Sequence, residues 1–316
     1  MKLSFVIPCY NSAQTIGEVI GALEQKMRDM AITDYEAILV NDASPQETLP
    51  TLRRLAQQYP FITVIDLAKN FGQHAAIMAG LRETTGDVIV CLDDDGQTPI
   101  GEVDKLVSAL GEDCDVAYAS YAQKAHGFAR NLGSRMNDWM LRFLLDKPKH
   151  LYLSSYFAAK RFVIDSVLEY RQPYPYLMGL ILRTTRAIKN VPVTHHEREN
   201  GKSGYTLQKL LSLWLNGLTN FSVKPLRLAS LMGVIFAIIG FLMVIVTVVM
   251  RFVRDYTLLG WTSTVAIILL LGGLILIMLG VMGEYIGRSY LCLNHQPQYV
   301  VRSVERAREK ETKTDA

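Results

Sequence analysis

Three consecutive acidic residues, Asp93, Asp94 and Asp95, follow an apolar run and could bind a divalent cation. The run, 88–92, has the composition of a buried strand. Adjacent carboxylates repel one another, so such a cluster costs free energy unless a cation offsets the charge. Magnesium is typically held by one or two carboxylates together with substrate phosphates. The alternative for this motif alone is a solvated acidic turn.

Polar residues also follow three earlier apolar runs, and they include Tyr10, Asn11, Asn41, Asp42 and Asn70. Short β-rich runs at 3–7, 36–40, 63–67, 88–92 and 116–119 alternate with helical patterns at 14–30, 46–58, 73–84 and 101–110. This alternation predicts an α/β fold with a mostly parallel sheet and helices on both faces. Ligands of such sheets bind at the carboxyl ends of the strands. We therefore expect one shared site at that edge.

Composition and motifs exclude several other classes of protein. The 316 residues carry a net charge of only +3, which does not favour nucleic acid as a partner. The sequence contains neither GxGxxG nor GxxxxGK[ST], so a dinucleotide fingerprint or a P-loop is not supported. Its four cysteines are scattered and are expected to be reduced and buried, without a zinc site or disulfides.

Two long segments, 228–250 and 256–283, contain no charged residue. About 20 residues cross a hydrocarbon core of ~30 Å, so the sequence predicts two spanning helices that form a hairpin. Two buried core helices are the alternative. Basic residues on both flanks favour cytoplasmic termini, although Arg251 and Arg254 in the connector oppose this orientation. The first apolar run is too short for a signal peptide, which agrees with a cytoplasmic amino-terminal domain.

Two amphipathic segments lie between the predicted sheet and the hairpin. Their apolar stripes, which include Trp139 and Trp214, could face a core or lie in the membrane interface. Basic residues accompany them and are suited to phosphate binding, although a solvated loop touching lipid headgroups is the alternative. These residues are Arg130, Arg135, His195, His196, Arg198 and Lys202, with Ser203 beside them.

Several motifs resemble the family 2 glycosyltransferases that make polyisoprenyl-phosphate sugars. They are Val6-Ile7-Pro8-Cys9-Tyr10-Asn11, Val40-Asn41-Asp42-Ala43-Ser44, Asn70-Phe71-Gly72-Gln73-His74, the acidic segment 86–97, the loop 198–205, Pro225-Leu226-Arg227 and Gly283-Glu284-Tyr285-Ile286-Gly287-Arg288. Dolichol-phosphate mannose synthase and bacterial undecaprenyl-phosphate glucosyl and aminoarabinose transferases are members. The resemblance covers nearly the whole chain.

This resemblance implies a GT-A fold and inverting, metal-dependent transfer of a sugar from a nucleoside diphosphate to a polyisoprenyl phosphate. The implied catalytic residues are Asp93, Asp95, Arg130, Arg198 and Lys202. The implied substrate-binding residues are Pro8, Tyr10, Asn11, Asp42, Asp93, Asp94, Ser134 and Ser203. Asp95 and Gln97 are expected to meet Mg²⁺ or Mn²⁺ on the diphosphate.

The chain departs from the family pattern at some positions. Ser12 replaces a usual Glu, and Ala43 replaces a frequent Gly. Some bacterial relatives place a catalytic base before the strand near Phe157, but 151–158 contains no acid here, so we assign no protein base. The lipid phosphate is already anionic and needs orientation more than activation. Its repulsion by the diphosphate would be offset by a cation and the basic cluster.

The expected organisation is a cytoplasmic GT-A domain (1–205), a juxtamembrane amphipathic helix (206–225), a transmembrane hairpin (226–288, spans near 228–250 and 261–283) and a cytoplasmic tail (289–316). The resemblance places this multi-pass protein in the bacterial inner membrane. It favours a UDP-sugar over a GDP-sugar and implies a homo-oligomer, with a tetramer as a candidate. A processive polysaccharide synthase and a non-catalytic membrane scaffold remain alternative functions. The tail residues 299–301 could form a strand within the chain or with another subunit, and 302–316 is expected to be a frayed helix or disordered.

Overall fold

The computed structural model describes residues 1–45, 47–121, 142, 147–194, 224–253, 261–294 and 296–306. The chain divides into two compact units. One comprises Met1–Tyr205 together with His295–Ala316, and the other comprises Thr206–Asn294. The two units are described separately below.

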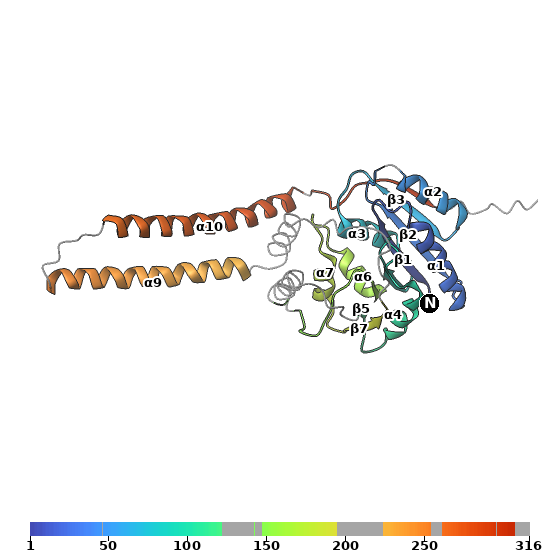
Figure 1. The fold of residues 1–316 in the computed structure, drawn as a ribbon, viewed down its shortest axis with the longest axis horizontal. Coiled ribbons are helices and arrows are strands. Elements are labelled where there is room, and N and C mark those ends of the chain that lie inside the picture. Colours follow the sequence, from blue (N-terminus) through green and yellow to red (C-terminus); the bar gives the residue numbers. More distant parts are fainter. Residues whose placement is uncertain are drawn as a thin grey trace, which may run out of the picture. The chain divides into compact units, whose positions relative to one another are not determined.

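The first unit is built on an eight-stranded sheet in the order β7-β5-β6-β4-β1-β2-β3-β8 (Figure 1). Its strands are β1 (Leu3–Cys9), β2 (Tyr35–Asn41), β3 (Ile62–Leu67), β4 (Val88–Cys91), β5 (Val116–Tyr121), β6 (Phe157–Lys160), β7 (Ile188–Val193) and β8 (Val301–Arg306). The β1 strand pairs in parallel with both β2 and β4, and β2 pairs in parallel with β3. The predicted mostly parallel α/β sheet is therefore confirmed.

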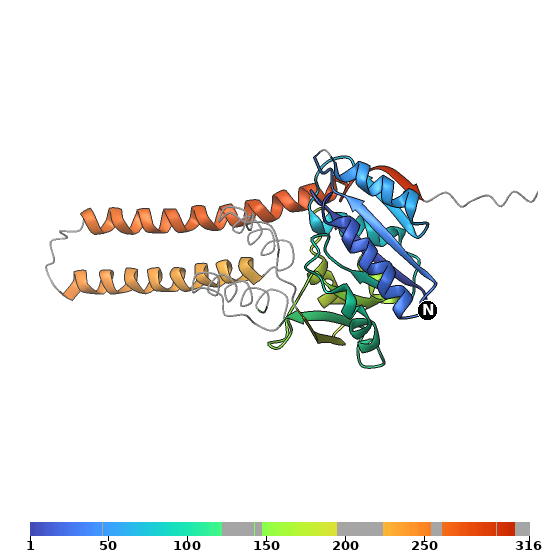
Figure 2. The ribbon, with the colours of Figure 1, turned by 45° about the vertical axis from the view of Figure 1, so that its right-hand side comes forward.

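Helices cover both faces of the sheet, as the alternating pattern predicts. The elements α1 (Ile16–Asp29), α2 (Thr48–Gln58) and α4 (Val103–Ala109), with the short 3₁₀ helix η1 (Ile100–Glu102), pack on one face. The opposite face is covered by α3 (Gln73–Glu83), α6 (Arg161–Leu168) and α7 (Leu177–Thr184) (Figures 1 and 2). All seven residues of β1 are buried, because a central parallel strand contacts helices on both sides.

The half of the sheet that follows β4 differs from a simple continuation of the parallel order. The β6 strand lies between β4 and β5 and pairs antiparallel with both. The β7 strand then pairs in parallel with β5. The two predicted strands at 88–92 and 116–119 are therefore separated by a strand that comes much later in the chain. This insertion brings the segment just before β6 to the end of β4.

The carboxyl-terminal tail also differs from the expectation. Residues 301–306 form β8, which pairs antiparallel with β3 of the same chain. The prediction of a frayed or disordered end is wrong for Arg302 to Arg306. The pairing is favourable because it covers the β3 edge, whose backbone N–H and C=O groups would otherwise be exposed. Residues 307–316 lie outside the described part.

The second unit contains two long helices, α9 (Lys224–Val253) and α10 (Trp261–Leu293), which lie side by side in both views (Figures 1 and 2). In α10 the stretch Leu271–Leu293 is long and apolar enough to cross a membrane, with a mean hydropathy of 1.4. The described part of α9 includes a shorter apolar stretch, Leu231–Leu242. The helix α10 continues past Gly283, the end of the second predicted span, to Leu293.

Candidate active site

A cavity of about 310 Å³ lies at the carboxyl ends of β1, β2 and β4. Its described lining residues are Pro8, Cys9, Tyr10, Asp42, Asn70, Gly72, Gln73, Asp93, Asp94 and Asp95. Four of these are carboxylic acids and none is basic. The shared site predicted at the strand ends is thus present, and its described walls carry a strong excess of negative charge.

The backbone turns sharply after each strand that contributes to the cavity. Positive φ angles occur at Asn11 (58°), Ala43 (48°), Gly72 (89°) and Gly96 (72°). Only glycine adopts positive φ angles without steric cost. Other residues that adopt them cluster at functional sites. The turns at Asn11 and Ala43 direct Tyr10 and Asp42 towards the cavity. Two further non-glycine residues, Ala31 (52°) and Tyr174 (57°), have positive φ away from the cavity, so such turns are not confined to this site.

Both carboxylate oxygens of Asp93 are occupied by side-chain donors. Gln73 Nε2 donates to Oδ1 at 3.0 Å, and the Ser155 hydroxyl donates to Oδ2. Burial is the largest cause that raises the pKa of Asp93 to about 6, with Asp95 and Asp94 adding to it, while the bonds from Ser155 and Gln73 act in the opposite direction. Asp93 is therefore held in one orientation by groups that stabilise its ionised form.

The Asp94 side chain is tied to the first strand. Its Oδ2 accepts the backbone N–H of Tyr10 at 3.0 Å, while its backbone carbonyl accepts the Thr15 hydroxyl at 2.6 Å. Burial raises the pKa of Asp94, and the bond from Tyr10 opposes that shift. Asp94 thus fixes the loop after β1 and the start of α1 against the acidic bend. This arrangement suits a positioning role at the edge of the cavity.

Asp95 is the least engaged of the three acids. In the described part of the chain its carboxylate accepts one hydrogen bond, from Gln97 N–H at 3.1 Å. The remaining lone pairs are available to a hard cation, which prefers oxygen ligands. Asp95 therefore fits the predicted metal role. Gln97 lies beside it, but the contact between them uses the backbone of Gln97 and the structure shows no role for its side-chain amide.

A metal site made of protein ligands alone is absent from the described residues. No group of three or more His, Cys, Asp or Glu residues among them could hold a metal ion. This agrees with a cation bound by one or two carboxylates and by the phosphates of a substrate, the usual arrangement for magnesium. The four acids and the lack of a basic residue in the described lining fit such a cation.

Asp42 organises the opposite wall of the cavity. Its two oxygens accept the backbone N–H groups of Phe71, at 2.7 Å, and Gly72, at 2.9 Å. Burial raises the pKa of Asp42, and the two N–H groups oppose that shift. The side chain therefore holds the loop that leads into α3 and places Gln73 near Asp93. Asp42 also lines the cavity, and its predicted role in bordering the substrate remains a prediction.

Of the predicted residues, Pro8, Tyr10, Asp42, Asp93, Asp94 and Asp95 line one cavity. Asn11 and Gln97 adjoin it without appearing in its lining. The predicted phosphate-binding residues lie outside the described part of the chain: Arg130, Ser134, Arg198, Lys202 and Ser203. Their roles remain predictions.

The sequence analysis placed Asn70 at the shared strand-end site without a specific role, and it assigned no role to Gln73 or Ser155. Asn70 and Gln73 belong to a motif that resembles the family, and this motif was the available signal. Ser155 had no such signal. It reaches Asp93 because β6 inserts beside β4, a pairing that joins residues more than 60 positions apart.

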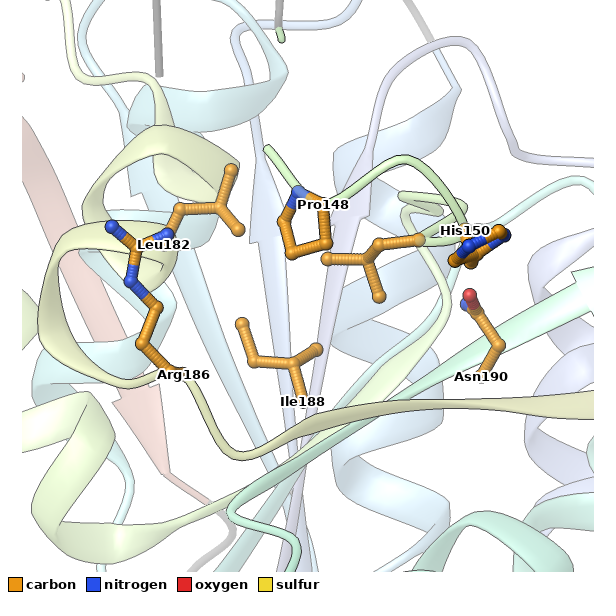
Figure 3. A pocket seen from close by; sticks show the side chains of 7 residues that line it. Pro148, His150, Leu182, Arg186, Ile188 and Asn190 are labelled. Carbon is orange, nitrogen blue, oxygen red and sulfur yellow. The ribbon is translucent and has the colours of Figure 1, made fainter. Parts of the chain in front are cut away.

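A second cavity, of about 250 Å³, lies between α7, β7 and the segment before β6 (Figure 3). Leu151, Leu182 and Ile188 form its apolar part, and Arg186 and His150 lie at opposite ends (Figure 3). Its described lining residues include no carboxylate, in contrast to the cavity at the strand ends.

Residues 4–168 match Glycosyl transferase family 2, and residues 224–289 match the GtrB C-terminal hairpin. The chain belongs to glycosyl transferase family 2, and its predicted likeness to the polyisoprenyl-phosphate glycosyltransferases is confirmed.

Similar proteins support this assignment over nearly the whole length. An uncharacterized glycosyltransferase, YkcC, of Bacillus subtilis is 32% identical over 95% of this chain and 93% of that protein. The undecaprenyl-phosphate 4-deoxy-4-formamido-L-arabinose transferase of Yersinia enterocolitica is 32% identical over 98% of this chain and 95% of that protein. The fold resembles glucosyl-3-phosphoglycerate synthase of Mycobacterium tuberculosis, solved with Mn²⁺ and UDP, with a TM-score of 0.51 and 19% identity over 68% of this chain and 76% of that one.

Proposed function

We propose that this enzyme transfers a sugar from a nucleoside diphosphate to the phosphate of a polyisoprenyl lipid, with undecaprenyl phosphate as the acceptor and a UDP-sugar as the preferred donor. The observation that carries the proposal is the cavity at the strand ends, which four acids line without a basic residue in its described walls. An anionic diphosphate enters such a cavity only with a cation. The similar fold that holds Mn²⁺ and UDP supports the same pairing here.

The described residues have distinct parts in this reaction. Tyr10 and Asp42 line the cavity and would border the nucleoside. Asp95, with Gln97 beside it, would hold Mg²⁺ or Mn²⁺ on the diphosphate. The bound cation would supply charge neutralisation of the departing diphosphate. Asp93, held by Gln73 and Ser155, would accept hydrogen bonds from the donor sugar and orient it.

The acceptor needs no protein base in this proposal. An oxygen of the lipid phosphate attacks the anomeric carbon, the bond from that carbon to the diphosphate breaks, and the nucleoside diphosphate leaves with the electron pair. The segment before β6 places the hydroxyl of Ser155, not an acid, next to Asp93. The side chains implied to orient the two anions are Arg130, Arg198 and Lys202. Proximity of this kind contributes effective molarities of roughly 10⁵ M or above.

The membrane arrangement is part of the same proposal. The hairpin would anchor the enzyme in the bacterial inner membrane, with 1–205 and both termini in the cytoplasm, where nucleotide sugars are made. The family of the hairpin, residues 224–289, supports an anchor that holds the enzyme at its lipid substrate. A homo-oligomer is also proposed.

The test uses the full chain in lipid nanodiscs with undecaprenyl phosphate and a panel of UDP- and GDP-sugars, with Mg²⁺, with Mn²⁺ or with a chelator. We expect one donor to give a lipid carrying a single sugar, detected by mass, and the chelator to abolish it. Asp95→Asn should lower turnover by roughly 10²-fold or more, because a ligand of the charge-stabilising group is lost. Asp113→Asn, a change at an exposed residue in a remote turn, is the matched control.

Each alternative has its own outcome in this experiment. A processive synthase would give a ladder of products with several sugars on one acceptor. A scaffold would give no product with any donor. Transfer that is insensitive to both the chelator and Asp95→Asn would contradict the metal role assigned to the acidic bend.

A further inference from the structure

We infer that β8, the strand that follows the hairpin, is a positioning element of the donor site, and that Arg302 acts on this site through Asp66 and Asn41. The inference rests on the proposed function, because it concerns binding of the nucleotide sugar. Its starting point is a buried carboxylate that the chemistry above does not use. Asp66, near the end of β3, is only 1% exposed.

The charge of Asp66 is compensated from the last strand of the sheet. Arg302 Nη1 lies 3.0 Å from Asp66 Oδ2, and Arg302 Nη2 donates to the carbonyl of Ala68 at 2.9 Å. An ionised carboxylate without a partner is costly in such a buried position. The Arg302 side chain is 59% exposed, whereas that of Asp66 is 2% exposed, so only the carboxylate of this pair is shielded from solvent.

Asp66 also accepts a hydrogen bond from a neighbouring amide. Asn41 Nδ2 donates to Asp66 Oδ1 at 2.7 Å, and Asn41 Oδ1 accepts the N–H of Ser44 at 3.2 Å. An ionised carboxylate can only accept, so the NH₂ of Asn41 must face Asp66 and its oxygen must face Ser44.

Ser44 carries this constraint to the mouth of the cavity. Its hydroxyl donates to the carbonyl of Cys9 at 3.2 Å and accepts the N–H of Asn11 at 3.2 Å. Cys9 lines the cavity, as does Tyr10 between these two residues. The turn is strained, since Asn11 has a φ of 58°. A strained turn persists only where surrounding contacts hold it, and Ser44 provides two of them.

A second connection runs along the backbone after β3. The N–H of Ala68 donates to the carbonyl of Val300 at 2.8 Å, next to the bond from Arg302 to Ala68. Two residues further on, Asn70 lines the cavity and donates to the carbonyl of Asp42 at 3.3 Å. The segment 300–302 therefore supports both walls of the donor site, at Tyr10 and at Asn70.

Other contacts hold β8 in place and provide a matched control. Arg53 and Glu305 form a bidentate pair, and Arg306 Nη2 lies 2.8 Å from Glu83. The side chain of Arg306 is 73% exposed, and its contact leads to the far end of α3. Arg306→Gln therefore removes a charge from the same strand without touching Asp66.

The experiment compares steady-state kinetics of the full chain carrying Arg302→Gln, Arg302→Lys, Asp66→Asn, the double change Arg302→Gln with Asp66→Asn, and Arg306→Gln. We expect Arg302→Gln to raise KM for the nucleotide sugar about tenfold, the size of coupling found within connected polar networks, with kcat within about threefold of the wild type. Arg302→Lys should have a KM between those of the wild type and Arg302→Gln, because the lysine ammonium keeps the charge but not both contacts. Asp66→Asn should also raise KM, because an amide at this position can donate and no longer fixes the orientation of Asn41. The double change should have the KM of Asp66→Asn alone to within about threefold, since Arg302 then has no carboxylate through which to act.

Several results would overturn the inference: a wild-type KM in Arg302→Gln, effects of Arg302→Gln and Asp66→Asn on KM that multiply in the double change, or an equal rise in Arg306→Gln. If Arg302→Gln does not fold, Arg302→Lys and the double change decide the question by the same KM comparison. A general loss of structure would lower kcat together with the unfolding temperature and would leave KM unchanged. The proposed function fails separately, when the wild type itself transfers no sugar.

Discussion

At Asp93 the hydroxyl of Ser155 and the amide of Gln73 each occupy one carboxylate oxygen. Without the Ser155 hydroxyl, the Asp93 carboxylate can rotate away from the donor sugar. We therefore expect Ser155→Ala to lower kcat roughly tenfold, as is typical when a partner that orients a site carboxylate is removed. Turnover of the nucleotide sugar under saturating acceptor would measure this effect.

The comparison variant is Ser166→Ala, which removes an exposed hydroxyl that accepts a weak bond of 3.4 Å from Thr184. It should keep wild-type turnover. Equal activity of both variants would mean that Ser155 does not position Asp93.

The elements that carry the site depend on close packing between α3 and the sheet. A Cβ added at Gly80 would lie 2.5 Å from Val6 Cγ1 and 3.0 Å from Val40 Cγ2, both on central strands. Gly80→Ala should therefore destabilise the fold by about 1–3 kcal/mol through overpacking. It should also lower turnover, because α3 begins at Gln73, which contacts Asp93. Chemical denaturation would measure the free energy of unfolding.

A glycine-to-alanine substitution in α1 is expected to raise the free energy of unfolding, the opposite of the effect at Gly80. A Cβ at Gly21 would meet no atom within 4 Å. Gly21→Ala should stabilise the protein by roughly 0.5–1 kcal/mol, because alanine lowers the entropy of the unfolded chain and favours a helix. Destabilisation by both changes, or by neither, would contradict the packing shown for α3.

For the molecule as a whole, the proposed topology predicts which residues are accessible from outside the cell. Asp255→Cys, in the connector between the helices and in a Cys292→Ser background, should react with a membrane-impermeant maleimide in intact cells. The other cysteines, Cys9, Cys91 and Cys114, are buried and should stay unlabelled. Tags at the two termini should be digested only in inverted vesicles. Labelling that requires cell lysis would reverse the orientation.

The sequence was sufficient for those parts of the protein that depend on local patterns. The runs at 3–7, 36–40 and 63–67 coincide with β1, β2 and β3, because buried parallel strands are continuously apolar. The acidic bend at Asp93 was recognisable because carboxylates directly follow a buried strand. The long uncharged segments correspond to α9 and α10, since helix length and charge exclusion are both visible in a linear chain.

Only the tertiary structure decided which groups meet across long separations. It placed β6 between β4 and β5 and so brought Ser155 to Asp93. It distinguished Asp95 from its two neighbours, because hydrogen bonds engage Asp93 and Asp94 more fully. It turned a tail expected to be frayed into β8, whose Arg302 compensates Asp66 from 236 positions away. Hydropathy and charge patterns over short ranges can be read from consecutive residues. Strand pairing and charge compensation instead depend on residues far apart in the sequence, which meet only when the chain folds.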